Sequence, residues 1–181
     1  LGFKPDLIWG FTRSGGQSKR MVDSSRGGSS RVHSDLDSTA TTGTVVISEF
    51  GTDGFTANGG QFNNDSGKTC GAWCWKANGG TTSTNTDGDI TSTVQVNQAA
   101  GFSIVQYTGT GTAATVGHGL GKAPKFILFK RLTGGTRNWA GFHASDHSDG
   151  KKSIILNSTS AGDVSNYFDG QIPTSSVFRV R

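Results

Sequence analysis

Helix-forming residues and charges are scarce in this sequence of 181 residues. Only 17% of the residues are charged, and there are one methionine and three prolines. No run of Leu, Ala, Glu and Lys repeats with the 3.6-residue period of a helix. No stretch approaches the roughly 18 apolar residues that a membrane-spanning helix needs, and no signal peptide is recognisable. These absences argue against a helical fold and against insertion into a membrane.

Glycine is abundant, with 28 residues, and short clusters of aromatic and β-branched residues alternate with Gly, Ser and Thr. This pattern predicts an all-β protein with many turns, of the β-sandwich or jelly-roll type. We expect strands at residues 6–12, 19–23, 44–48, 55–57, 71–76, 92–96, 102–108, 125–130, 139–143, 153–157 and 177–181.

The net charge of +4 comes from 17 basic and 13 acidic residues. A basic balance can indicate nucleic-acid binding. Here the basic residues are dispersed, and no block of five like charges occurs. We therefore expect no nucleic-acid partner.

The two cysteines, Cys70 and Cys74, lie in one expected strand. Four residues of strand span roughly 13 Å, whereas a disulfide needs Cα atoms within about 7 Å, so the pair should not be bridged. Alternation places both cysteines on one face, with Trp73 and Trp75 on the other. This arrangement predicts buried free thiols in a strand that is covered on both sides. No further Cys or His lies at the spacing of a zinc site.

The opening segment, residues 1–9, recurs at residues 120–128 with an offset of 119. Both copies run from Leu-Gly through Pro to an apolar strand and then a Gly-Gly turn. The identities within the first 16 aligned positions are Leu1, Gly2, Pro5, Ile8, Gly15 and Gly16 with Leu120, Gly121, Pro124, Ile127, Gly134 and Gly135.

This repeat predicts two copies of one small β-sandwich or jelly-roll-like unit. The first unit would span residues 1–77 without its leading strand, and the second residues 100–181 without its closing strand. The polar segment 78–99, rich in Gly, Thr and Asn, has the composition of a linker or long loop. Both units would be cut by the ends of a fragment.

Paired carboxylates are the first candidates for chemistry, because glycoside hydrolysis uses two carboxyl groups about 5 to 9 Å apart. Asp35 with Asp37, and Asp87 with Asp89, could each share a face. Both pairs lie in loop-like segments, so solvated turn residues are the better interpretation. Asn85, Asp87 and Asp89 alternate as in a calcium loop, but no bidentate Glu follows them.

The segment 143–149 gathers His, Ser and Asp, as a nucleophilic triad or a cation site would. Triads are assembled from distant segments, so a polar loop is the better interpretation. His118 lies between glycines and is expected to be structural. The Gly-x-Gly at 109–111 lacks the context of a phosphate loop. We predict no catalytic residue, no metal and no cofactor.

Exposed aromatic rings are the usual contacts for sugars, because their faces stack on pyranose C–H groups. Trp9, Trp139 and Tyr167 are the candidates for glycan contact. Each also alternates like a core residue, so core packing is the alternative interpretation.

Five segments of the chain resemble repeat-containing structural proteins of tailed bacteriophages, which are common in marine phages and are associated with tail-fibre or lectin-like modules. They are residues 71–77, 101–112, 116–127, 138–139 and 172–178. The resemblance covers nearly the whole chain and implies a virion role. It supplies no catalytic residue. In members of that family the second unit usually closes with a strand like Ala-Trp-Cys-Trp at 72–75, which is a further reason to expect a truncated second unit.

The resulting hypothesis is a non-enzymatic virion protein, assembled in the host cytoplasm. It would be a tail-fibre adhesin that contacts host surface glycan, beside other virion proteins and as a homotrimer. The alternatives are a capsid decoration protein, a polysaccharide depolymerase domain and a bacterial surface lectin.

Overall fold

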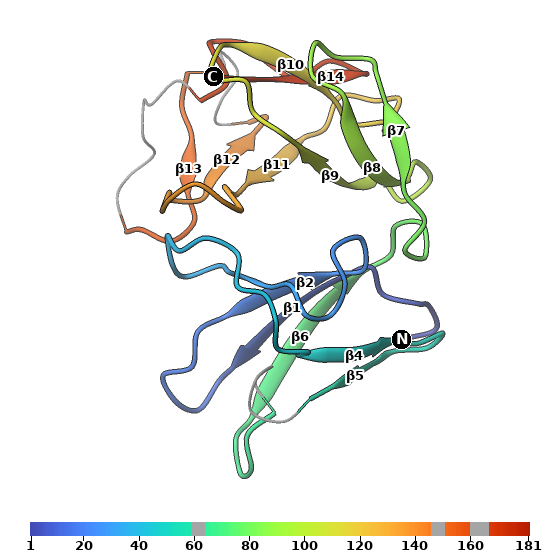
Figure 1. Ribbon diagram of the computed structural model, residues 1–181, viewed down its shortest axis with the longest axis vertical. Coiled ribbons are helices and arrows are strands. Elements are labelled where there is room, and N and C mark those ends of the chain that lie inside the picture. The colour runs from blue at the N-terminus through green and yellow to red at the C-terminus, as the bar shows by residue number, and fades with distance from the viewer. Residues whose placement is uncertain (59–63, 146–150, 160–166) are drawn as a thin grey trace. The chain divides into compact units, whose positions relative to one another are not determined.

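The computed structural model describes residues 1–58, 64–145, 151–159 and 167–181 (Figure 1). Within these residues the backbone forms short strands in antiparallel sheets, and no helix is present. The prediction of an all-β fold is confirmed. It follows that the described part of the chain contains no membrane-spanning helix. The chain divides into two compact units.

Unit 1 comprises Leu1–Gly80 and Lys130–Asn138. A four-stranded sheet with the order β3-β2-β1-β6 and a two-stranded sheet β4-β5 form it. Their bounds are β1 Leu7–Thr12, β2 Arg20–Asp23, β3 Val32–His33, β4 Ile47–Phe50, β5 Phe55–Ala57 and β6 Cys70–Trp75. The loop 130–138 joins this unit because the Arg137 N–H donates to the carbonyl of Asp37, and the Ala40 N–H donates to that of Leu132.

The core of unit 1 lies between its two sheets. Alternation along β1 buries Ile8 and exposes its neighbours in part, as a strand with one covered face requires. Ile8 and Val22 pack with Val46 and Ile47, all of which are nearly inaccessible to solvent. Partly buried residues of β4, β5 and β6 complete this cluster: Phe50, Phe55, Ala57 and Cys74. The unit is therefore sandwich-like, with apolar burial as its main source of stability.

Asp6 is a buried carboxylate at the start of β1, with no exposed surface. Its side chain accepts hydrogen bonds from the backbone N–H groups of Ala77 (2.7 Å) and Gly79 (3.0 Å), beyond the end of β6. It also accepts one from the Ser24 hydroxyl at 2.6 Å, beyond the end of β2. One carboxylate thus ties three segments together, and the donors compensate for its burial.

Unit 2 comprises Thr81–Phe129 and Trp139–Arg181. It contains sheets with the orders β7-β8-β9, β10-β14 and β11-β12-β13. Their bounds are β7 Ser83–Asn85, β8 Ser92–Asn97, β9 Phe102–Tyr107, β10 Ala114–Gly117, β11 Phe126–Phe129, β12 Ala140–His143, β13 Ile154–Ile155 and β14 Val177–Val180. One cluster of buried apolar residues consists of Ile90, Ala114, Val116 and Phe178, and partly buried residues of β9, β11 and β14 pack against it.

The two units share a three-stranded motif with corresponding registers. β1 and β2 place Ile8 opposite Val22. At the offset of the sequence repeat, β11 and β12 place Ile127 opposite Phe142. The third strand follows the same scheme, with Met21 opposite Val32 in unit 1 and Gly141 opposite Ile154 in unit 2. The repeat found in the sequence is therefore a repeat of strand pairing.

The motifs differ on the outer side of their first strand. β1 pairs with β6 on this side, whereas β11 is the last strand of its sheet among the described residues. The position of Asp6 is occupied in unit 2 by Lys125. Both residues accept the same backbone hydrogen bond through their carbonyls, from Ser24 at 2.8 Å and Ala144 at 2.9 Å. A carboxylate is needed only at Asp6, because this side chain accepts from the N–H groups that follow β6.

The segment 78–99 was expected to be a linker or long loop with a strand at 92–96, and the structure places a second strand, β7, within it. It contains β7 and β8, which pair with one another and, through β8, with β9. The polar residues of this segment pair with the neighbouring strands through backbone hydrogen bonds, which do not require apolar side chains. The sequence repeat predicts the loop 130–138 in the second unit. It belongs to unit 1 instead, because its backbone forms hydrogen bonds with Asp37 and Ala40 of that unit.

Candidate contact surface

An aromatic strip lies on β1 and β6, on the face of the sheet away from Ile8. Trp9 stands directly opposite Trp73 in the register of the two strands. Their rings meet edge to face, with centroids 5.2 Å apart and planes at 82°. The Phe11 ring is tilted against Trp73 at 4.8 Å. We define this aromatic strip as Trp9, Phe11 and Trp73.

Two contacts hold the aromatic strip in place. The Trp9 indole N–H donates a hydrogen bond of 2.9 Å to the Ser34 hydroxyl. Phe11 lies across Gly71, where a Cβ atom would come within 2.6 Å of the Phe11 ring. The glycine therefore makes room for the ring. Trp73 remains 54% exposed, so a large ring is fixed in solvent rather than buried. Fixing a side chain before binding lowers the entropy that a ligand must overcome.

The three residues predicted for glycan contact fall in different surroundings. Trp9 belongs to the aromatic strip. Trp139 is only 4% exposed, so its ring offers no open face to a sugar, and its backbone N–H donates to the Asn157 side chain. Tyr167 is half-buried in a turn of unit 2. Trp9 thus belongs to unit 1, and Trp139 and Tyr167 belong to unit 2.

Trp73 and Phe11 were missed as contact residues by the sequence analysis. Alternation did place Trp73 on the face opposite the cysteines, and the registers agree with this. The expectation that β6 is covered on both sides is not met, because Trp73 is exposed. An aromatic residue opposite a glycine across two strands is a signal that could have identified Phe11 and Gly71 as a pair.

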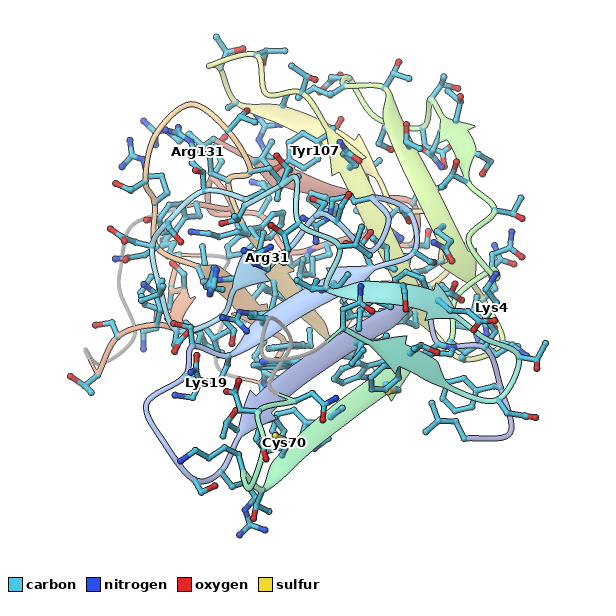
Figure 2. All side chains as sticks on the ribbon, turned by 60° about the horizontal axis from the view of Figure 1, so that its bottom comes forward. Lys4, Lys19, Arg31, Cys70, Tyr107 and Arg131 are labelled. Atoms are coloured by element: carbon cyan, nitrogen blue, oxygen red, sulfur yellow. The ribbon has the colours of Figure 1, made fainter. Side chains whose placement is uncertain are left out.

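The cysteines are both free, as predicted. Cys74 packs against the core of unit 1, and burial raises the pKa of its thiol. Cys70, at the beginning of β6 (Figure 2), is exposed, contrary to the expectation of two buried thiols. The difference follows from its place at the end of the strand, beyond the part of the sheet that the β4-β5 hairpin covers.

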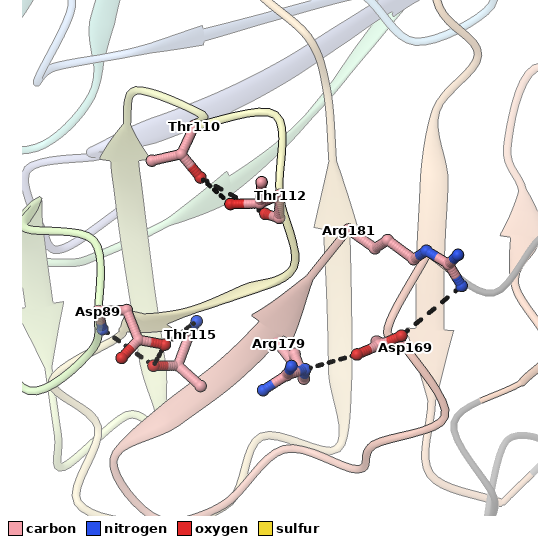
Figure 3. A network of polar contacts seen from close by, with 7 residues as sticks. All are labelled: Asp89, Thr110, Thr112, Thr115, Asp169, Arg179 and Arg181. Carbon is pink, nitrogen blue, oxygen red and sulfur yellow. Dashed lines mark hydrogen bonds and ion pairs between the residues drawn. The ribbon is translucent and has the colours of Figure 1, made fainter.

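The predicted carboxylate pairs serve turns. Asp35 accepts from the Lys19 backbone N–H at 3.1 Å and lies 3.5 Å from the Lys19 ammonium. Asp89 accepts from the backbone N–H and the hydroxyl of Thr115, at 2.9 and 2.8 Å (Figure 3). These hydrogen bonds, the backbone one first, hold the pKa of Asp89 below its usual value. Asp87 is bound to the Asn85 side chain. Figure 3 also shows Asp169 between Arg179, which lies on β14, and Arg181, which follows that strand.

The His, Ser and Asp cluster at 143–149 lies partly outside the described residues. Within them, the Ser145 hydroxyl and His143 Nδ1 are 2.8 Å apart. No group of three His, Cys, Asp or Glu side chains suited to a metal ion occurs in the described ranges.

His118 is enclosed in unit 2, with 2% of its surface exposed. Its Nδ1 accepts the Leu120 backbone N–H at 3.1 Å, and its Nε2 lies 3.3 Å from the Thr174 carbonyl. The ring stacks on Phe178, with planes at 12°. A neutral imidazole protonated on Nε2 satisfies both contacts. This is the structural role that the sequence indicated.

His118 should make stability depend on pH. Burial lowers the pKa of this ring, against smaller raising effects from Thr174 and Asp87. The unfolded chain therefore takes up the proton first as pH falls through about 6.5, and stability decreases from there until the folded ring is also protonated. We expect a lower urea midpoint at pH 5 than at pH 7, and a smaller difference in His118→Gln. Burial also lowers the pKa of His33, so His33 can contribute to the same pH dependence. The variant His33→Gln is therefore measured in parallel, to separate the contributions of the two histidines. An unchanged pH dependence in His118→Gln would contradict this assignment.

Comparison with known proteins gives one family. The domain of unknown function DUF7483 matches residues 1–181, the whole chain. No curated protein and no solved structure matches the sequence.

Proposed function

We propose that this chain, which belongs to the DUF7483 family, is a non-enzymatic virion protein of a tailed bacteriophage that contacts host surface glycan. The observation that carries the proposal is the aromatic strip, in which an exposed tryptophan is held by two further rings. The contact is made by a surface on a rigid sheet, and no chemical step is involved.

The physics of sugar binding supports this use of the aromatic strip. A pyranose ring offers C–H groups to an aromatic face, and polar neighbours take its hydroxyls. One such contact is weak. A homotrimer on a particle that carries many copies would multiply it, because the second and later contacts form at high effective concentration. Partners within the virion would hold the copies in place.

The sequence motifs support the choice of a virion. The segments 71–77 and 101–112, among others, resemble repeat-containing phage structural proteins. Segment 71–77 forms most of β6 and carries Trp73. The resemblance therefore includes the strand that carries the exposed ring of the aromatic strip.

Replacing Trp73 by Ala should weaken glycan contact while leaving the fold intact. The measurement is binding of the labelled protein to an array of bacterial capsular polysaccharides and lipopolysaccharides. We expect at least about a tenfold lower affinity, as for loss of an aromatic anchor. The cost in folding free energy should be about 1 kcal/mol, since the ring is half exposed and loses mainly its aromatic contacts.

Phe126→Ala is the matched control, because Phe126 is an exposed aromatic residue (51%) on β11 of unit 2. It should bind the array as the unchanged protein does. Equal loss in both variants would indicate nonspecific hydrophobic adsorption. Full binding by Trp73→Ala would exclude the aromatic strip as the contact surface.

A capsid decoration protein is the alternative within the same resemblance. A density map of the particle that places the chain on the shell would favour it over a tail-fibre adhesin. A polysaccharide depolymerase has no observation in its favour, because Asp35 is paired with Lys19 and Asp89 is bound to Thr115. Release of oligosaccharide that is lost in Asp35→Asn would reverse that judgement.

A further inference from the structure

Three basic side chains lie together on one side of the β2·β3 ladder in unit 1. Arg20 stands directly opposite His33. Arg31 precedes His33 by two residues, so alternation puts it on the same side. Its backbone is fixed by reciprocal hydrogen bonds with Thr41, at 3.0 and 2.9 Å. This basic cluster, defined as Arg20, Arg31 and His33, lies on the face of the sheet opposite the aromatic strip, because Arg20 pairs with Gly10 and not with Trp9.

Arg31 is the residue that requires explanation. The residue is 9% exposed, and within the described parts of the chain its Nε and Nη1 atoms have no hydrogen-bond partner. A guanidinium stays charged at every accessible pH. Buried cations are normally paired, since removing a charge from water without a partner is strongly unfavourable. Figure 2 shows where Arg31 lies in unit 1. Its unsatisfied N–H groups point to a negatively charged partner.

The surroundings of Arg31 are predominantly positive. Burial lowers the pKa of Arg20, and the charge of Arg31 lowers it further. The pKa of His33 is lowered by burial and then by both arginines. Asp35 and Asp65 act in the opposite direction on Arg20, but Asp35 is already engaged by Lys19. The like charges repel one another, and a bound anion would relieve this repulsion.

We infer that the basic cluster is a binding site for an oxyanion group, that is, a phosphate, sulfate or carboxylate. Arg31 donates from its buried guanidinium, Arg20 adds positive charge from the neighbouring strand β2, and His33 takes up a proton more readily once the anion is bound. The inference does not depend on the proposed glycan contact, which uses the other face of the sheet. A free anion and an anionic group on a larger ligand share this chemistry.

The test is a titration of the full chain with inorganic phosphate at constant ionic strength, with chloride as the balancing ion. NMR of the His33 ring reports the site. We expect a saturable shift of its signals, together with a rise of its pKa in phosphate, because a nearby anion favours the imidazolium. Acetate in a parallel titration tests whether a carboxylate is sufficient. Tighter binding of phosphate would favour a phosphoryl group, and equal binding would favour any oxyanion.

Arg31→Gln should abolish the saturable response, and Arg31→Lys should weaken it at least about tenfold, since lysine keeps the charge but not the planar donors. Arg13→Gln is the matched control, because Arg13 is an exposed arginine of the same unit. It should respond as the unchanged protein does. If Arg31→Gln fails to fold, the lysine variant and the His33 titration of the unchanged protein still show whether the basic cluster binds the anion. A linear, unsaturable response, or an equal response in both Arg31 variants, would overturn the site.

Discussion

Asp6→Ala should destabilise unit 1 by about 3–5 kcal/mol, because it leaves backbone donors without an acceptor. The Ala77 N–H is buried and would lose a charged partner, and so would the partly buried Gly79 N–H. Each unsatisfied buried donor costs about 1–3 kcal/mol, and hydrogen bonds to charged groups lie at the upper end. The loss would be a large fraction of the 5–15 kcal/mol by which most domains are stable.

Urea unfolding followed by tryptophan fluorescence measures this effect, because Trp9, Trp73 and Trp75 all lie in unit 1. Asp53→Asn is the control, since Asp53 is an exposed carboxylate of the same unit. Its midpoint should stay close to that of the unchanged protein. A loss below about 1 kcal/mol in Asp6→Ala would mean that water replaces the carboxylate, and that β6 is held by its backbone ladder alone.

Gly28→Ala should cost about 3 kcal/mol or more, through a clash with backbone. A Cβ atom at this position would lie 1.7 Å from the carbonyl oxygen of Ile47 and 2.8 Å from its carbon. The Gly28 carbonyl also accepts from the N–H groups of Val46 and Ile47, two residues of the buried core. The methyl group would therefore push the β4 strand from its place and weaken both the hydrogen bonds and the packing.

Gly54→Ala is the matched control for Gly28→Ala. A Cβ atom at Gly54 would meet nothing within 4 Å, and this glycine is not among those with a positive φ. Its stability should stay the same or rise by up to about 1 kcal/mol, because alanine restricts the unfolded chain. The measurement is the urea midpoint of each variant. Equal midpoints for the two variants would show that β4 can shift at little cost.

The strands predicted from the sequence were those with apolar alternation and clear turns. β1 shows this alternation in its burial, because one of its faces packs on the core. β2, β9, β12 and β14 are short segments with apolar residues between turns. The exceptions were β3, β7 and β10. β7 consists of Ser83, Thr84 and Asn85, whose composition is that of a loop, and it is a strand because β8 is beside it. β10 is built of small residues and pairs with β14, more than 60 residues later. Such pairings depend on partners that local patterns do not contain.

The candidate site was predictable only in part, for a similar reason. Trp9 was selected as an exposed aromatic residue, but Trp139 was selected on the same grounds and lies in the interior of unit 2. Alternation assigns a side chain to one face of a strand. It does not say which face another element will cover, since that is decided by segments distant in sequence. The basic cluster was missed because Arg20 and Arg31 are brought together by the β2·β3 pairing.

The difference between Asp6 and Lys125 also protects the chain against folding incorrectly. Tandem units with the same hairpin can exchange strands during folding, and misassembly of this kind is a known hazard of repeat proteins. If β6 were to add to β11, the amide donors that follow it would meet the ammonium of Lys125 in place of a carboxylate. The Lys125 ammonium and the N–H groups after β6 would repel one another. Pairing of β6 with β11 would therefore be disfavoured relative to its pairing with β1. A single charge reversal would thus let two hairpins with corresponding registers coexist in one polypeptide without competing for the same strand.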